Sequence, residues 1–400
     1  MMQAVVAAVK TDDSSPLKAD GLVTVSDAAP DPTYRITLGA NATPEEHYAA
    51  DRLQHWLQTA CECRIAVISI LNTNDTVKQT HQLAVGSAAA SSIVAAPTDD
   101  LGQEGFVLRS DTATRSIAIT GASGAPRGAI YGVYEYLERL GFEFFDSNVS
   151  SVPRKLASLF FDVNERQMPT MSDWRHCNNA NLELQQHTEL SIAQRQNNNG
   201  GVEAYTSRDV QKIGGGVRWA SPPGFVHTSF TIVPPSEYKS THPEWFGESQ
   251  LCWTNTSLLA FMTQRVKAYL DADVNATVIS VSQNDGGGAC HTAEEDRVAA
   301  EEGSDSGPLL RGVNIIADAI ADEYPHVVVE TLAYVYTRKP PNVTRPRSNV
   351  VIRLSNIECD FLHPLEERTT KANIRFMADL DAWSEVSNRT WIWTYITDFG

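Results

Sequence analysis

Two acidic residues stand where a sugar-cleaving site could use them. Asp285 follows the apolar run Val278–Val281 and precedes three glycines, and Glu358 follows a second strand-like run, NVVIRLSN. Cleavage of a glycosidic bond requires one protonated acid to assist the leaving oxygen and one carboxylate to attack or to activate water. We therefore predict Asp285 and Glu358 as a catalytic pair, with the two roles left open between them.

Each acid also has a simpler interpretation. Asp285-Gly286 is a common turn dipeptide, in which the carboxylate folds onto the following backbone amides. Glu358 could be an ordinary loop acid. Glu330 alternates with valines inside its own predicted strand, so we expect an interior salt bridge there rather than chemistry.

Amide, aromatic and basic side chains gather at the ends of the same apolar runs. Aromatic rings cover the apolar face of a pyranose, and amides, arginine and histidine satisfy its hydroxyls. His227 and His242 could instead anchor a loop. The predicted sugar-binding residues are Arg175, His227, His242, Gln283, Asn284, Tyr334, Tyr336, Asn356 and Trp393.

The cysteines and acids give little support for a metal site. Cys290-His291 is followed by Glu294 and Glu295, but this spacing matches no standard zinc pattern. Acids at that place are typical of a helix N-terminus. The spacing of the six cysteines is that of neither a disulfide framework nor a zinc site, so we expect mostly buried thiols. We predict no metal and no organic cofactor.

The second half of the chain alternates between strand and helix patterns. Apolar, β-branched strands that alternate with amphipathic helices indicate a parallel sheet. Neither a dinucleotide fingerprint nor a phosphate-binding loop is present, which favours a (β/α)8 barrel over an open sheet. We count six or seven barrel strands before the sequence stops at Gly400, so we expect the barrel to be incomplete. The strand candidates are residues 172–177, 217–223, 276–282, 326–337, 349–358 and 389–399.

The first part of the chain has a different order of predicted helices and strands. Residues 1–20 are small and polar and are predicted to be a disordered leader. Residues 21–165 are predicted to form an α+β domain, and residues 166–400 the barrel domain. Within the first domain we predict helices over 44–60 and 129–142. Strands are predicted over 34–40, 64–70, 81–87, 104–110 and 115–121.

Composition narrows the partners. The formal charge of −17 would repel nucleic acid. No apolar run is long enough to span a bilayer. The oligomeric state cannot be inferred. Seven glycosylation sequons favour a secreted or lumenal protein; they stand at Asn41, Asn74, Asn148, Asn255, Asn275, Asn342 and Asn388.

Several motifs are familiar. The segments AADRLQHWL, EGFVLR and IAITGASGAPRGAIYGVYEYLERLGFEFFD resemble the N-terminal domain shared by family 20 hexosaminidases and family 67 α-glucuronidases. The segments QLCWTN, ISVSQNDGGGAC, SGPLLRGVN, VETLAYVYTRKPP and IRLSNIECDFLHPL resemble the domain of unknown function 4838, also called glycoside hydrolase family 163. Together these resemblances extend over nearly the whole chain from Tyr34.

The resemblance implies an activity. It implies endo-acting hydrolysis, with retention of configuration, of β-linked N-acetylglucosamine in complex N-glycans, with Asp285 and Glu358 as the acids. Two alternatives stay open. One is an α-glucuronidase-like hydrolase of uronic acids, for which Arg175, Arg338 and Lys339 could pair a substrate carboxylate. The other is a non-catalytic carbohydrate-binding protein with a degenerate barrel.

Overall fold

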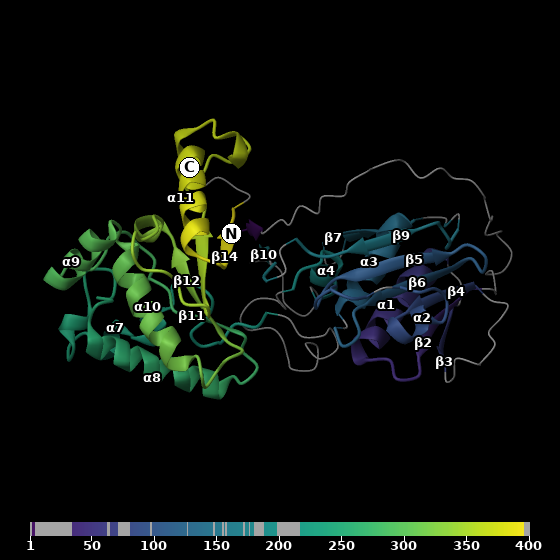
Figure 1. The fold of residues 1–400 in the computed structure, drawn as a ribbon, viewed down its shortest axis with the longest axis horizontal. Helices are drawn as coiled ribbons and strands as arrows, with labels where there is room; N and C mark the ends of the chain where they lie inside the picture. The colour runs from purple at the N-terminus through teal and green to yellow at the C-terminus, as the bar shows by residue number, and fades with distance from the viewer. Residues whose placement is uncertain are drawn as a thin grey trace.

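The computed structural model describes residues 2–4, 34–61, 65–70, 81–96, 98–125, 127–146, 149–153, 156, 158–170, 173–175, 177–179, 188–197 and 217–395. In these residues the chain is a mixed α/β protein with two separate large sheets (Figure 1). One sheet belongs to the N-terminal part and the other to the C-terminal part. The predicted fold class, an α+β domain followed by a barrel-like α/β region, is therefore confirmed.

The N-terminal sheet has six strands in the order β3-β2-β4-β6-β5-β9. Four of these strands run parallel, and β5 is antiparallel to both of its neighbours. The predicted strands and both helices of this part are present. The elements are β2 (Tyr34–Gly39), α1 (Pro44–Cys61), β3 (Ala66–Ile70), β4 (His81–Val85), α2 (Ser87–Ser91), β5 (Phe106–Asp111), β6 (Ser116–Gly121), α3 (Arg127–Arg139), a β7–β8 hairpin (Glu143–Asp146 and Val149–Ser151) and β9 (Asn164–Gln167).

Helix α1 shows why these residues form a helix. Thr43 and Glu46 form a reciprocal capping box: the Glu46 backbone N–H donates to the Thr43 hydroxyl at 3.2 Å, and the Thr43 backbone N–H donates to the Glu46 carboxylate at 3.0 Å. Ala49, Leu53 and Leu57 recur every four residues and are buried against the sheet. Each buried leucine contributes about 1.5–3 kcal/mol.

The C-terminal sheet consists of four parallel strands, in the order β11 (Val278–Ser280), β12 (Val328–Ala333), β13 (Val350–Ser355) and β14 (Thr390–Trp393). Its longer helices are α8 (Thr256–Ala272), α9 (Ala293–Glu302), α10 (Ser306–Ile320) and α11 (Lys371–Val386). Short helical turns precede α8, namely α6 (Ser229–Ile232), α7 (Pro235–Tyr238) and η1 (Pro243–Trp245), and two more lie between α10 and α11, namely η2 (Val335–Thr337) and η3 (Leu365–Glu367).

The two faces of this sheet differ, as expected for a barrel wall. Ile279, Val329 and Ile352 lie in one core with the apolar faces of α8, α10 and α11. Residues of opposite pleat, such as Val278 and Val351, pack instead with tryptophans. Because side chains alternate along a strand, the first face is the outer, helix-covered face and the second is the inner face.

The first two predicted barrel strands are described only in part. Residues 217–220 pair with β11: Trp219 forms a parallel bridge to Val278, and the Ala220 backbone N–H donates to the Val278 carbonyl at 2.8 Å. Residues 173–175 form no strand, and the Trp174 side chain packs on the inner face against Trp219 and Trp391. Residues 172 and 176 lie outside the described residues, so the count of six or seven barrel strands stays a prediction.

Two short strands, β1 and β9, lie at the beginning of the chain and near the first predicted boundary. Most of the predicted leader lies outside the described residues, but Met2–Ala4 form β1, which pairs antiparallel with β10 (Cys177–Asn179). The disordered leader over residues 1–20 stays a prediction. Strand β9 extends the N-terminal sheet to Gln167, just past the predicted boundary at residue 165. Helix α4 (Thr188–Ala193) follows β10 in the chain.

The cysteine prediction was partly wrong. Cys252 and Cys290 form a disulfide across 38 residues of sequence, and Cys61 is also disulfide-bonded. Cys359 is a buried free thiol, as predicted. Sequence spacing did not indicate the Cys252–Cys290 pair because the two residues become neighbours only when the loops that carry them pack together.

Glu302 ends α9 in a fully buried position and ties it to α10 and to the loop after η2. Its carboxylate accepts from the backbone N–H groups of Val343 and Thr344 at 2.9 Å and from Arg311 at 2.5 Å. Burial alone would raise the pKa of Glu302, but these bonds and that from the Thr344 hydroxyl lower it to about 2.

We expect Glu302→Gln to lower the free energy of unfolding by about 3 kcal/mol at pH 7, because it leaves buried donors without a charged acceptor. The pKa of Glu302 in the folded state lies below the ordinary 4.5. The difference in the free energy of unfolding between wild type and variant should therefore narrow as the pH falls from about 4.5 toward about 2. Urea unfolding at pH 7 and pH 3 measures this. Glu301→Gln, at a half-exposed neighbour that pairs with Arg297 and Arg311, should change little at either pH.

Candidate functional site

Three residues predicted from the sequence meet at the carboxyl ends of the parallel strands. Asp285 follows β11, Tyr334 follows β12, and His227 comes from the loop after the Trp219 bridge. The Tyr334 hydroxyl donates to Asp285 Oδ1 at 3.4 Å, and His227 Nε2 lies 3.8 Å from the same oxygen. Barrel enzymes place their active sites at this end of the sheet.

Tyr334 keeps its proton in this arrangement. Burial first, and then the charge of Asp285, raise the pKa of Tyr334 to about 12. The hydroxyl is therefore neutral across the physiological range and acts as a hydrogen-bond donor toward the carboxylate.

The backbone is strained next to both partners of Asp285. His227 has a φ of 53° and Val335, directly after Tyr334, has a φ of 51°. Such left-handed conformations are costly for residues other than glycine and are concentrated at functional sites. His227 Nδ1 lies 3.1 Å from the Gln283 carbonyl oxygen, which can only accept. Nδ1 therefore carries a hydrogen, and the bond turns Nε2 toward Asp285.

Asp285 also makes the turn contact that its Asp-Gly dipeptide suggested. The Gly286 backbone N–H donates to Asp285 Oδ1 at 2.9 Å. The side chain is 71% exposed, however, and it faces a tyrosine and a histidine. A turn does not require a tyrosine and a histidine beside the carboxylate. Asp285 therefore makes a structural contact with the turn and is also accessible beside two polar side chains.

Glu358, the second predicted acid, lies just past the end of β13 and pairs with Arg338. Arg338 also contacts Asp379 of α11 at 2.7 Å. Glu358 remains half-exposed, and its charge contributes to the raised pKa of Tyr334. The two predicted acids thus both act on Tyr334, Asp285 by a hydrogen bond and Glu358 through its charge.

Gln283 and Asn284 form hydrogen bonds next to the cluster of Asp285, Tyr334 and His227. Gln283 is fully buried; its amide donates to the Tyr334 carbonyl at 2.9 Å and accepts from the Thr337 hydroxyl. The backbone of Asn284 is bonded to the Gln250 side chain. In this structure both residues hold loops in place, and their predicted contact with sugar stays a prediction.

Asn356 and Trp393 join the ends of β13 and β14. The Asn356 amide donates to the Thr394 hydroxyl at 2.8 Å and accepts from the Tyr395 backbone N–H at 3.2 Å. Trp393 is buried and stacks on Phe225. Tyr395, which the sequence prediction missed, packs with Trp393 and Tyr334 in one apolar cluster, and the charge of Asp285 contributes to its raised pKa after burial.

Three other predicted sugar ligands have structural contacts. Arg175 is buried, pairs with Glu104 of the N-terminal part at 2.8 Å and donates to the Arg195 carbonyl. His242 stacks on Trp245 with ring centroids 3.9 Å apart, which matches its alternative as a loop anchor. The Tyr336 ring is mostly covered, and Glu295 and Asp305, carried by α9 and by the turn before α10, contribute to its raised pKa after burial. None of these contacts presents the side chain as an open sugar ligand.

The predicted interior salt bridge at Glu330 is confirmed. Glu330 Oε1 lies 2.7 Å from Arg353 Nε, and both side chains are fully buried on the inner face. The Arg353 guanidinium lies over four rings, 4.3 Å from that of Trp393, 5.1 Å from Trp219, 5.5 Å from Trp174 and 5.8 Å from Phe225. This charged, aromatic layer lies beneath the ends of the strands that carry the site.

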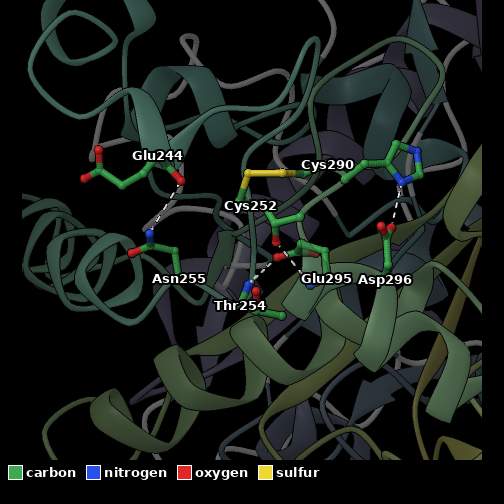
Figure 2. Close-up of a disulfide and its surroundings, with 9 residues drawn as sticks. Glu244, Cys252, Thr254, Asn255, Cys290, Glu295 and Asp296 are labelled. Carbon is green, nitrogen blue, oxygen red and sulfur yellow. Dashed lines mark hydrogen bonds and ion pairs between the residues drawn. A yellow bond between two sulfur atoms is a disulfide. The ribbon is translucent and has the colours of Figure 1, made fainter.

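A disulfide borders the loop that follows Asp285. Figure 2 shows the Cys252–Cys290 bond between two loops, with Glu295 beside it accepting from the Thr254 backbone N–H at 2.5 Å. His291, once considered with Cys290 as a metal ligand, instead pairs with Asp296 at 2.8 Å. Within the described ranges, no group of three or more histidine, cysteine, aspartate or glutamate side chains could hold a metal ion. Over the same residues, every helix is too short or too polar to cross a bilayer.

Two families match the sequence. The family described as Domain of unknown function (DUF4838) matches residues 144–400. The family described as Glycosyl hydrolase family 67 N-terminus matches residues 29–136. No curated protein matches.

Two solved structures are similar to this chain. One is a family GH115 4-O-methyl-α-glucuronidase with specificity for decorated arabinogalactans, at a TM-score of 0.50 and 13% identity, covering 91% of this chain and 54% of that one. Another is a GH138 enzyme targeting pectin rhamnogalacturonan II, at a TM-score of 0.42 and 11% identity, covering 91% of this chain and 58% of that one. The chain thus spans little more than half the length of these enzymes, and the first likeness shows a glycoside hydrolase-like fold.

Proposed function

This chain belongs to the family described as Domain of unknown function (DUF4838), and we propose that it is a glycoside hydrolase whose reaction centre lies around Asp285. One observation carries this proposal: Asp285 is exposed at the end of a parallel strand and is contacted there by Tyr334 and His227. An accessible carboxylate among groups that can donate or exchange protons is what general acid–base chemistry requires.

The proposed mechanism uses two carboxylates without a cofactor. Asp285 and Glu358 take the roles of acid and of nucleophile or base, with the assignment open between them. Tyr334 donates a hydrogen bond to Asp285 in the ground state. An oxocarbenium-like transition state would form between the acids, with help from a substrate acetamido group where one is present.

For the substrate, we propose β-linked N-acetylglucosamine in N-glycan-type oligosaccharides, the activity of glycoside hydrolase family 163. The local charge supports a substrate without a carboxylate. Asp285, Glu358 and Asp379 are acidic, and Arg338 already contacts two of them. A uronic acid would bring another negative charge into this surrounding.

A uronic acid hydrolase is the second candidate, because the N-terminal part matches the family 67 N-terminus and the GH115 structure is that of a glucuronidase. A uronic acid hydrolase needs a cation that is free to pair with the substrate carboxylate. The three cations considered for it already have acceptors: Arg175 contacts Glu104, Arg338 contacts Glu358, and Lys339 donates to the Gly303 carbonyl at 2.8 Å. One of these three contacts would have to break before its cation could pair with a substrate carboxylate.

Parallel digestion tests the substrate class. The full chain is incubated with complex N-glycans and, separately, with glucuronoxylan, and products are identified by mass spectrometry. We expect cleavage after β-linked N-acetylglucosamine and no release of glucuronic acid. Release of glucuronic acid alone would reverse the choice. Binding of glycan without turnover would instead indicate a carbohydrate-binding protein.

We also propose a secreted or lumenal location. The Cys252–Cys290 disulfide supports it, because disulfides persist mainly in oxidising compartments. The sequons noted above agree with that location.

A further inference from the structure

The loop that carries Asp285 has little internal support. Gly286 and Gly288 have φ values of +117° and +95°, and a Cβ added at Gly287 or Gly288 would touch nothing within 4 Å. Glycine backbones lose the most conformational freedom when they are ordered. Something outside the loop must therefore fix the position of the carboxylate.

That support comes from a neighbouring hairpin, Phe246–Leu251, closed by an antiparallel bridge between its end residues. Gln250 within it is buried. Its Oε1 accepts from the Asn284 backbone N–H at 2.9 Å, and its Nε2 donates to the Asn284 carbonyl at 2.8 Å and the Gly286 carbonyl at 3.5 Å. A single amide thus pairs with the backbone on both sides of Asp285, as a neighbouring strand would.

The same hairpin holds the far end of the loop. The Ser249 hydroxyl donates to the Gly287 carbonyl at 3.0 Å. The disulfide joins Cys252, directly after the hairpin, to Cys290, directly after the glycines and Ala289, and both cysteines are buried (Figure 2). Gly247 lies so close that an added Cβ would be 3.1 Å from the Cα of Cys290. The loop is therefore fastened at its beginning, middle and end.

We propose that hairpin 246–251 and the Cys252–Cys290 disulfide form a brace that positions Asp285 for catalysis, with Gln250 as its positioning residue. This inference rests on the proposed function of Asp285 as a reacting carboxylate. It adds a dependence on redox state, because reduction of the disulfide releases one end of the brace. A small displacement of a reacting group is enough to slow catalysis strongly.

The first test replaces Gln250 with methionine, which has a similar size and no amide. We expect kcat on the N-glycan substrate to fall about 10- to 100-fold with KM within about threefold, because chemistry is misaligned while binding surfaces remain. Gln54→Met is the matched control, because it removes an amide bonded to the Ile65 carbonyl in the N-terminal part. An unchanged kcat, or a rise in KM alone, would overturn the positioning role.

The second test removes the disulfide. The double variant Cys252→Ala/Cys290→Ala should show a similar loss of kcat. Dithiothreitol should lower the kcat of wild type toward that of the double variant and leave the double variant unchanged, which separates this disulfide from that of Cys61. Cys359→Ala should respond to dithiothreitol as wild type does. Equal rates for wild type with and without reductant would reject the redox dependence.

A third measurement does not depend on activity. Hydrogen exchange at the amides of residues 284–288 should become at least about tenfold faster in Gln250→Met and in reduced wild type, while amides of β12 keep their protection. If wild type cleaves neither glycan, the proposed function fails, and this exchange measurement still decides the brace. Unchanged exchange in both samples would refute it.

Discussion

Asp285→Asn is expected to lower turnover of the glycan substrate by about 10²- to 10⁴-fold, the range found when a catalytic acid or base is removed. The amide cannot ionise or transfer a proton as the carboxyl group does. It still offers an oxygen to the Gly286 N–H and to the Tyr334 hydroxyl, the two hydrogen bonds that Asp285 accepts. Fold and glycan binding should therefore persist, and kcat from mass-spectrometric progress curves measures the loss.

Glu358→Gln should give a loss of the same order, although it also frees one side of Arg338. Asp318→Asn is the control, because Asp318 is an exposed acid that pairs only with Arg347 among the described ion pairs. Full activity in Asp285→Asn would remove Asp285 from the mechanism. Equal glycan binding by wild type and variant, with turnover by neither, would favour the carbohydrate-binding alternative.

The regular elements could be predicted because their patterns are local. Helix α1 repeats buried residues every four positions, and β11 to β14 are short apolar runs separated by helix patterns. The pairing of Trp219 with Val278 agrees with the strand predicted over 217–223. The packing of Trp174, Trp219 and Trp391 on the inner face could not be read from the same local pattern, because it joins distant segments.

The sequence could predict those site residues whose positions are set by the ends of strands. Asp285 lies shortly after β11, and Tyr334 directly follows β12. Their positions at the same edge of the sheet followed from the rule that parallel strands present their carboxyl ends together. Contacts between distant segments could not be read in the same way. The ion pair of Arg175 with Glu104, the brace around Gln250 and the Cys252–Cys290 disulfide depend on how loops pack. Tyr395 was overlooked although it lies just past the end of β14.

The largest effect on stability is expected at Glu330. Burial raises the pKa of Glu330 and lowers the pKa of Arg353, while each partner opposes the shift of the other. Glu330→Gln leaves the Arg353 guanidinium in a layer of aromatic rings, where it still donates to the Phe225 carbonyl. We expect a loss of about 3–5 kcal/mol in the free energy of unfolding, the usual cost of an uncompensated buried charge.

Urea unfolding at low temperature measures this loss, and the double variant Glu330→Leu/Arg353→Met provides the decisive comparison. Replacing a buried pair by apolar residues of similar volume is often neutral or stabilising. The double variant should therefore recover most of what the single variant loses, and a loss below about 1 kcal/mol in Glu330→Gln would contradict the argument. Arg353 lies against Trp393 and on the strand that leads to Asn356, so the double variant also tests function. If the Glu330–Arg353 pair serves only stability, the kcat of the double variant should stay within a few-fold of wild type.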